Sequence, residues 1–165
     1  MDADQPSEVT AVAEQLHAAT SVTQLLSLTA ESLVRLLNAP ACTISRVIGD
    51  LLVDLVQHQR SGSPNRLGHG YLISDYPVTR SVIEDREPRT VYAGDPEADK
   101  SETALLGELG FDSLLMLAIE SKDAAWGLVE VYGDEGRQFD MSDVDRARAV
   151  AVEAGEALAR LSSAH

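Results

Sequence analysis

Apolar and small residues recur at intervals of three and four positions through the N-terminal part of the chain. The members of this stripe are Val9, Val12, Leu16, Ala19, Thr23, Leu26, Ala30, Leu33 and Leu37. Such a period is typical of amphipathic helices. Residues 20–23 are β-branched or cap-forming, so the pattern predicts two helices over residues 7–19 and 21–38, with one kinked helix as the alternative. Asn38 and Pro40 end the segment.

The next segment has the pattern of strands rather than helices. Residues 41–48 and 51–59 are rich in apolar and β-branched side chains and flank Gly49-Asp50, which favours a hairpin. Residues 61–70 are rich in Gly, Ser, Pro and Asn and predict a loop.

Shorter elements are predicted through the middle of the chain. Asp75-Tyr76-Pro77 favours the start of a helix that ends near Asp85, because proline suits the first helical turn. A short strand is expected over residues 89–93. Residues 101–109 then predict a helix that is closed by Gly110.

A second hairpin is the clearest pattern in the chain. Residues 113–119 are apolar on both alternating faces, as a strand covered on each side requires. Residues 126–132 form the second strand, in which Glu130 is a lone charged residue among apolar neighbours. Ser121, Lys122 and Asp123 supply a polar turn between them.

The C-terminal residues predict one long helix. Its start has the pattern of a capping box, Ser142 with Asp145 three residues later. Its apolar stripe consists of Val144, Ala147, Ala151, Ala154, Leu158 and Leu161. The complete order of elements predicts an α+β fold: a mainly antiparallel central sheet of about five to six strands, with the terminal helices on one face and short helices and loops on the other.

The hairpin, the Phe139-x-x-x-Asp143 spacing and the final helix together resemble the C-terminal half of a GAF domain. The order of elements extends this resemblance over nearly the whole chain. It implies a single domain over residues 1–165, with N-terminal helices (7–38), a sheet with pocket elements (41–133) and a C-terminal signalling helix (142–161).

The resemblance also implies a function. GAF domains are regulatory sensors that bind a small molecule and transmit their state to a signalling output, such as a sensor kinase or a bacterial enzyme of cyclic di-nucleotide turnover. Their terminal helices commonly pair two domains, so a homodimer is expected through these helices, with a downstream signalling domain as partner. The alternative for the apolar stripe is that it only covers the domain's own sheet. The alternative for the whole chain is a ligand-free dimerisation or protein-interaction module.

Composition narrows the choice of partners and location. The chain has 165 residues, of which 44% are hydrophobic, and a net charge of −14 from 27 acidic and 13 basic residues. That charge repels nucleic-acid backbones and anionic membrane surfaces. The N-terminus does not resemble a signal peptide, and no apolar run is long enough to span a membrane. One cysteine, Cys42, permits no internal disulfide, so a cytoplasmic location is expected.

Catalytic and metal-binding motifs are absent from the sequence, so we predict that the chain is not an enzyme. A redox enzyme built on the GAF scaffold would be expected to use several cysteines. Acidic and hydroxyl residues from Asp95 onward alternate like an EF-hand loop. The decisive positions are, however, Lys100 and Leu106, where calcium requires glycine and a carboxylate. No metal site is predicted.

The sequence also argues against bilin and haem as cofactors and against a cyclic nucleotide as the ligand. Bilin-attaching GAF domains usually have a cysteine followed by histidine, whereas Cys42 is followed by Thr43, so a bilin is not expected. Haem would depend on His69, a loop histidine between two glycines. Cyclic nucleotides fit poorly, because the family's Asn-Lys pair is missing and Val144 stands where a glutamate follows Asp143.

The predicted ligand site lies between the second strand and the following helices, where a GAF pocket is expected. Arginines suit an anion, and tyrosines suit a planar group, so a nucleotide or a small anion is the expected ligand. Core packing of the tyrosines and ordinary surface ion pairs of the arginines are the alternatives. The predicted binding residues are His58, Arg66, His69, Tyr71, Asp75, Tyr76, Arg80 and Tyr92.

Overall fold

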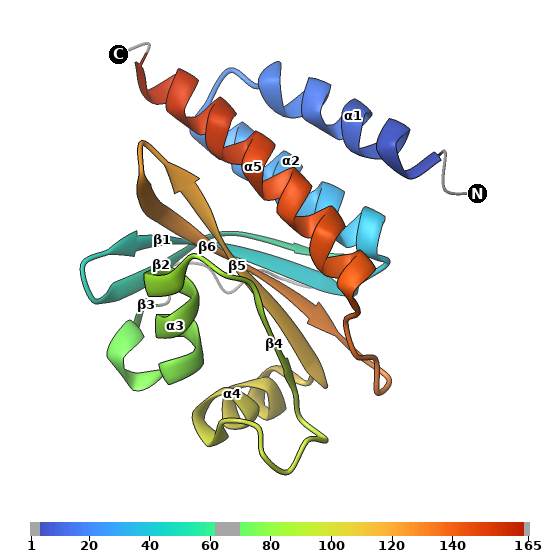
Figure 1. Cartoon of the computed structure of the whole chain (residues 1–165), viewed down its shortest axis with the longest axis vertical. Helices are drawn as coiled ribbons and strands as arrows, with labels where there is room; N and C mark the ends of the chain where they lie inside the picture. The colour runs from blue at the N-terminus through green and yellow to red at the C-terminus, as the bar shows by residue number, and fades with distance from the viewer. Residues whose placement is uncertain (1–3, 62–69, 164–165) are drawn as a thin grey trace.

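The fold is a six-stranded antiparallel sheet between two layers of helices (Figure 1). The computed structural model describes residues 4–61 and 70–163. The elements in chain order are α1 (Asp4–His17), α2 (Val22–Leu37), β1 (Ala41–Ile48), β2 (Leu51–Gln59), β3 (Gly70–Leu72), the 3-10 turn η1 (Ile73–Asp75), α3 (Pro77–Asp85), β4 (Arg89–Tyr92), α4 (Lys100–Leu109), β5 (Ser113–Ser121), β6 (Ala124–Gly133) and α5 (Met141–Ser163). The predicted α+β class is therefore confirmed.

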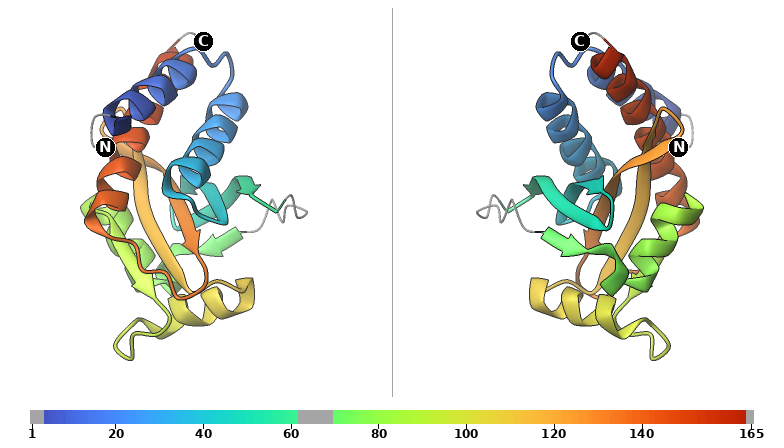
Figure 2. Two further views of the ribbon diagram at one scale, coloured as in Figure 1. Left: turned by 90° about the vertical axis from the view of Figure 1, so that its right-hand side faces the viewer. Right: turned by 90° about the vertical axis from the view of Figure 1, so that its left-hand side faces the viewer.

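The strand order is β3-β2-β1-β6-β5-β4, which puts the first and last hairpins side by side through β1 and β6. Helices α2 and α5 pack on one face of the sheet, and α1 packs outside them (Figure 2). We call this the terminal-helix face. Helices α3 and α4 lie on the other side, which we call the α3/α4 face.

Strand β5 shows why the sheet has two apolar cores. Its alternate side chains Leu115, Leu117 and Ile119 belong to the core under the terminal helices, and Leu114 and Met116 belong to the core under α3 and α4. A strand buried on both faces requires such a continuous apolar run, and that run made β5 predictable from sequence.

The two N-terminal helices are separate, so the alternative of one kinked helix is wrong. Ser21 caps α2, where its Oγ accepts a hydrogen bond from the Gln24 N–H at 3.1 Å. Asn38 ends α2 in a left-handed conformation with φ 50°. Both cap types are common because they satisfy backbone groups that the helix leaves unpaired.

The start of α5 differs from the prediction. Asp140, not Ser142, caps the helix: its Oδ1 accepts from the Asp143 N–H at 2.9 Å, and Asp143 Oδ2 accepts from the Asp140 N–H at 3.0 Å. The reciprocal pair is a capping box two residues before the expected one, in which aspartate plays both roles. Asp143 is buried and also pairs with Arg137 and Arg146.

One strand was not predicted. Strand β3 has three residues and pairs with the start of β2. A strand this short carries too few side chains for an alternating pattern to be recognised. Within the described residues, no helix is both long and apolar enough to cross a membrane.

Candidate functional site

A band of polar side chains lies across β2, β1 and β6 on the α3/α4 face, and it consists of Asp54, Thr43, Ser45 and Glu130. Pairing in register brings Thr43 of β1 next to Glu130 of β6, and Ser45 next to Asp54 of β2. Directly paired residues of antiparallel strands point to the same face, so this band lies within the core under α3 and α4. Thr43, Ser45 and Glu130 are buried.

Glu130 is the centre of this band. Glu130 is 8% exposed, and its carboxyl accepts a hydrogen bond from the Tyr132 hydroxyl at 3.3 Å. Burial raises the pKa of Glu130 from 4.5 to about 8, and the nearby charges of Asp54 and Glu102 add to the rise. At neutral pH the side chain therefore exists mainly as a neutral acid that can donate or accept a hydrogen bond.

A second buried carboxyl, Glu102, joins α4 to α3. Its Oε1 accepts from the Thr79 hydroxyl at 2.6 Å and from the Thr79 backbone N–H at 3.3 Å. Burial raises the pKa of Glu102, while the two hydrogen bonds from Thr79 oppose the rise. The same hydroxyl lies 3.4 Å from Met116 Sδ of β5, so the contact fixes both helices over the middle of the sheet.

Tyrosines border the polar band. Tyr71 of β3 and Tyr76, just before α3, pack edge to face with ring centroids 6.1 Å apart. Tyr132 stacks on Phe111 at 4.8 Å. Partial burial and the neighbouring carboxylates raise the pKa of both Tyr71 and Tyr76, so their hydroxyls stay protonated and can donate hydrogen bonds.

Not every predicted site residue reaches this band. Tyr71 and Tyr76 lie together, and Asp75 is exposed beside Tyr76. Arg80 points to solvent, where its Nε donates to Glu84 at 2.8 Å, so the alternative of a surface ion pair is the one found. Arg66 and His69 lie outside the described residues.

His58 lies on the wrong face for the predicted site, and a β-bulge is the reason. Without a bulge, His58 would share a face with Leu52, six residues earlier, which is in the core under α3 and α4. Ser45 pairs with Asp54 and Ile44 with Val56, so one extra residue of β2 shifts the alternation. His58 therefore stands opposite Cys42, on the terminal-helix face.

Tyr92 is also turned away from the band. Val91, the residue before it, belongs to the core under α3 and α4, so Tyr92 points to the opposite face of the sheet. Its partner Ser113 on β5 points to the same face as Tyr92. The strand was predicted correctly, but the short run around Tyr92 did not reveal which face is buried. Tyr92 is half-buried and belongs to neither apolar core, and its place on the opposite face keeps it out of the band.

Charge on the α3/α4 face does not match the expected anion. Among the described residues, the band has the carboxyl groups of Asp54 and Glu130, and that of Glu102 lies close to it on α4, whereas Arg80 forms an ion pair with Glu84. Glu130 stands out in the sequence as a lone charge in an apolar strand, and that is the signal for this site. Glu102 and Thr79 were missed, because polar residues on short surface helices are common and give no signal of their own.

A hollow of about 350 Å³ is found elsewhere, on the terminal-helix face between α5 and the β5–β6 turn. Among its charged groups, Arg86 pairs with Glu120 at 3.2 Å, and Arg148 pairs with Glu87 at 3.2 Å. A ligand there would have to displace these pairs. We therefore place the candidate site at the polar band and not at this hollow.

Cys42 cannot contribute to the polar band. It is fully buried in the core under the terminal helices, and burial raises the pKa of its thiol, with the charge of Glu130 adding to the rise. A protonated, enclosed thiol is unreactive. The predicted role of Cys42 as a small core residue is confirmed.

Comparison with known proteins gives a family and a fold. The family model described as "GAF domain" matches residues 21–158. The phycoerythrobilin-bound GAF domain from a cyanobacterial phytochrome has a TM-score of 0.84 at 14% identity, with 100% of both chains covered. The phycocyanobilin-bound GAF domain from a cyanobacterial phytochrome has a TM-score of 0.83 at 17% identity, covering 98% of this chain and 97% of that one.

Larger proteins share the fold as well. The chromophore-binding domain of an unusual bacteriophytochrome from R. palustris has a TM-score of 0.83 at 14% identity. The match covers 96% of this chain but 61% of that domain, so the present chain spans less than two thirds of its length. None of the curated proteins matches this sequence.

These structures correct the expectation that a bilin is not bound. That expectation depended on the residue after Cys42, which concerns only attachment through a thioether. Several solved structures similar to this chain are GAF domains with a bound bilin, among them one with biliverdin. The fold therefore accommodates bilins, and the cysteine argument was too narrow. Haem would depend on His69, which lies outside the described residues.

Proposed function

This chain belongs to the GAF domain family, and from that membership we propose that it is a sensor whose small-molecule ligand binds over the α3/α4 face. The observation that supports this location best is the buried, proton-binding carboxyl of Glu130 in the middle of the sheet. A carboxyl group in an apolar core lowers stability unless it is fully hydrogen-bonded. Strongly shifted pKa values of this kind cluster at functional sites.

The chemistry of the polar band favours a ligand with hydrogen-bond donors. The carboxyl groups of Glu102 and Glu130 accept hydrogen bonds, and the rings of Tyr71 and Tyr76 offer flat apolar contacts. A planar molecule with N–H groups or a positive charge suits these groups better than a nucleotide phosphate or a small anion does. Bilins, which carry pyrrole N–H groups, belong to this class, and here one would be held without a thioether.

A thermal-shift screen tests the proposal. We expect biliverdin or another planar N–H donor to raise the Tm of the wild-type chain, because a ligand that binds only the folded state stabilises it. Cyclic GMP and phosphate serve as anionic comparators and are expected to give no shift. In Glu130→Gln, the same shift is expected to need at least tenfold more ligand, because the amide cannot release a proton on binding to give the carboxylate that N–H donors favour. Glu31→Gln, an exposed change of the same charge on α2, is the matched control.

Absence of any shift from planar donors, or equal shifts in wild type and Glu130→Gln, would contradict the proposed site. A shift from cyclic GMP that Arg80→Gln removes would instead support the anion site that the sequence suggested. Biliverdin binding is also checked after denaturation, where the absence of a coloured adduct on the chain is expected, because Cys42 is enclosed.

The signalling output is a separate part of the proposal. Terminal helices α1 and α5 lie side by side, with both ends of the chain on the terminal-helix face (Figure 1). A ligand-dependent change could pass through α5 to a downstream domain such as a sensor kinase or a cyclic di-nucleotide enzyme. Linking this chain to such a domain and measuring its activity with and without ligand would test the coupling.

A ligand-free interaction module is the second candidate, and an exposed apolar patch favours it. Ile48, Leu51 and Leu72 are 56%, 39% and 50% exposed and are cross-strand neighbours on β1, β2 and β3. They lie beside the β1–β2 turn, and none of them belongs to either apolar core. A protein partner could cover them.

A further inference from the structure

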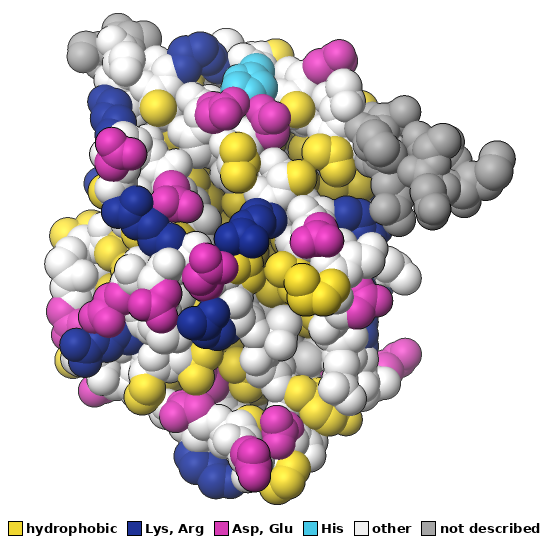
Figure 3. Space-filling view, viewed as in Figure 1, with side chains coloured by type: hydrophobic (Ala, Val, Ile, Leu, Met, Phe, Trp, Pro, Cys, Tyr) yellow, Lys and Arg dark blue, Asp and Glu magenta, His cyan; other side chains and the backbone are white. Residues whose placement is uncertain are grey.

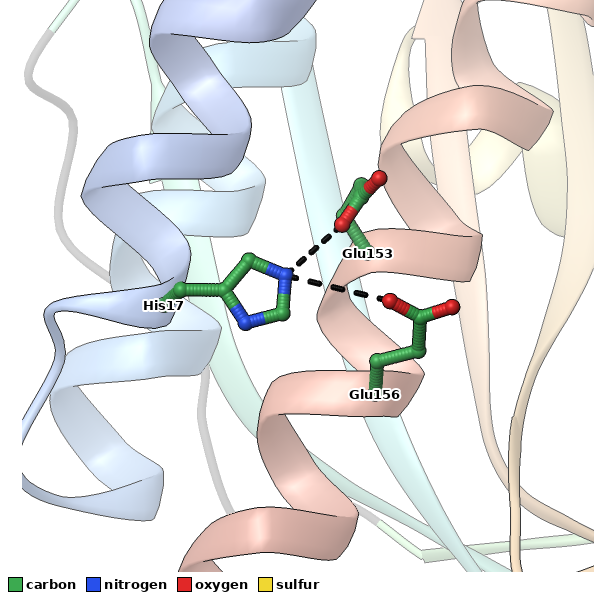
Figure 4. Close-up of side chains that lie close together, drawn as sticks. All are labelled: His17, Glu153 and Glu156. Atoms are coloured by element: carbon green, nitrogen blue, oxygen red, sulfur yellow. Dashed lines mark hydrogen bonds and ion pairs between the residues drawn. The ribbon is translucent and has the colours of Figure 1, made fainter.

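His17, the last residue of α1, faces two glutamates of α5 (Figure 4). Its Nε2 lies 2.7 Å from Glu153 Oε2 and 3.9 Å from Glu156 Oε2. The three atoms that could bind an ion all lie within 4.8 Å of one another. Glu153 and Glu156 stand three residues apart on one helix, so they share a side of α5 and meet His17 together.

The geometry is close to that of a zinc site. Ligand atoms 2.0–2.2 Å from a tetrahedral Zn²⁺ stand about 3.4 Å apart. The two distances from His17 Nε2, 2.7 and 3.9 Å, bracket that separation, so small rotations of the glutamate side chains would make them equal. One imidazole nitrogen with two carboxylates is a donor set that Zn²⁺ accepts, whereas Mg²⁺ and Ca²⁺ prefer oxygen ligands alone.

Electrostatics favour a cation at this position. Two carboxylates on neighbouring turns of one helix repel each other, and the chain has a net charge of −14. The nearby cation Arg160 is engaged with α1, because it donates to the carbonyl oxygens of His17 at 2.7 Å and Ala19 at 3.3 Å. These bonds fix the end of α1 and leave the two carboxylates facing the imidazole.

The cluster is open to ions from solution. The side chains of His17, Glu153 and Glu156 are 39%, 32% and 63% exposed. Nε2 would bind the metal through its lone pair, in the tautomer of the imidazole that carries its proton on Nδ1. A water molecule would complete a four-coordinate site.

We propose that His17, Glu153 and Glu156 bind one Zn²⁺ ion that fastens α1 to α5. The contact would add a metal cross-link to the packing of Val12 and Leu16 in the core under the terminal helices. His17 precedes residues 21–158, the range of the family match, whereas Glu153 and Glu156 lie within it, so the site would join a helix outside the matched range to a helix inside it. An ion here would restrict the motion of the terminal helices, which the proposed signalling uses.

Calorimetric titration of the EDTA-treated, dialysed full chain with ZnCl₂ tests the site. We expect saturable binding of one ion per chain and a rise in Tm of about 5 °C or more at a hundredfold excess over Kd. MgCl₂ and CaCl₂ at equal concentration are expected to give no comparable rise. Zn²⁺ is also expected to slow hydrogen exchange of the amides of α1.

Variants identify the ligands. His17→Ala and Glu153→Gln are each expected to weaken Zn²⁺ binding at least tenfold and to abolish the change in exchange of α1. Glu14→Gln, an exposed change of the same charge on α1, is expected to retain both. Glu156 is the most exposed of the three ligands, so Glu156→Gln is expected to stay folded. It can be used to test Zn²⁺ binding if another variant is unstable. Zn²⁺ binding that is absent, or that survives unchanged in the ligand variants, overturns the proposal.

Discussion

At the scale of single residues, the carboxyl of Glu130 makes the stability of the domain depend on pH. Its pKa in the folded chain is about 8, against 4.5 for the ordinary group, so the folded state binds this proton more tightly than the unfolded state. The stabilisation from the bound proton is complete below about pH 4.5 and is lost as the pH rises to about 8. The free energy of unfolding should fall over this window by a few kcal/mol, on the order of 1.4 kcal/mol per unit at most.

Urea unfolding at several pH values between 5 and 8.5 measures this dependence. We expect Glu130→Gln to have a shallower fall than the wild type, with a smaller remainder from Glu102, whose pKa is raised in the same direction. Glu31→Gln should keep the wild-type slope. Equal slopes in Glu130→Gln and wild type would mean that Glu130 is charged in the folded protein at neutral pH.

The same residues show how far sequence could define the site. Glu130 was visible as a lone charge in an apolar strand, because one interrupted run is a local signal. His58 could not be placed, because the bulge in β2 depends on pairing with β1 and inverts the face of every later residue. The link between Thr79 and Glu102 joins residues 23 apart on two helices and exists only in three dimensions.

At the scale of elements, helix α5 approaches the sheet most closely at Gly155. A Cβ atom built there would lie 2.2 Å from the Glu120 carbonyl oxygen of β5, which is backbone and cannot turn aside. Gly155→Ala should therefore push α5 away and lower the free energy of unfolding by about 1–3 kcal/mol, despite the better helix propensity of alanine. Chemical denaturation measures the change.

Gly107 in α4 is the matched control, because a Cβ there meets nothing within 4 Å. Gly107→Ala should raise the free energy of unfolding by about 0.5–1 kcal/mol through helix propensity alone. The opposite signs of the two changes are the test: a stabilising Gly155→Ala would show that α5 can move away from β5 without loss of packing.

Elements with strong local signals were predictable, and those set by pairing were not. The hairpin of β1 and β2 and the turn of β5 and β6 follow from short turn sequences. Lys122 and Asp123 both have positive φ, as a two-residue turn of type I′ requires. The cap of α5 was predicted at Ser142 instead of Asp140. Several acidic and hydroxyl residues occur together from Asp140 to Asp145, and the sequence does not show which of them is the cap.

At the scale of the whole molecule, the apolar stripe of α5 is already used. Ala147, Ala151, Ala154, Leu158 and Leu161 are all buried between α5, the other terminal helices and the sheet. The alternative interpretation of the stripe, that it covers the domain's own sheet, is therefore the one found. The outer surface around α5 has interspersed positive, negative and small apolar side chains instead of an apolar seam (Figure 3).

We therefore expect this chain alone to be a monomer of 17.7 kDa at micromolar concentration, since its net charge of −14 also makes two copies repel. Light scattering coupled to gel filtration in 0.15 M salt measures the mass. Val152 is 54% exposed on α5. If the chain is a dimer and Val152→Glu dissociates it, the result would support dimerisation through α5. A dimer that Leu51→Glu dissociates would instead assign self-association to the apolar patch of β1, β2 and β3. In that case the interaction module would become the stronger candidate, because covering that patch would then be shown to stabilise an assembly.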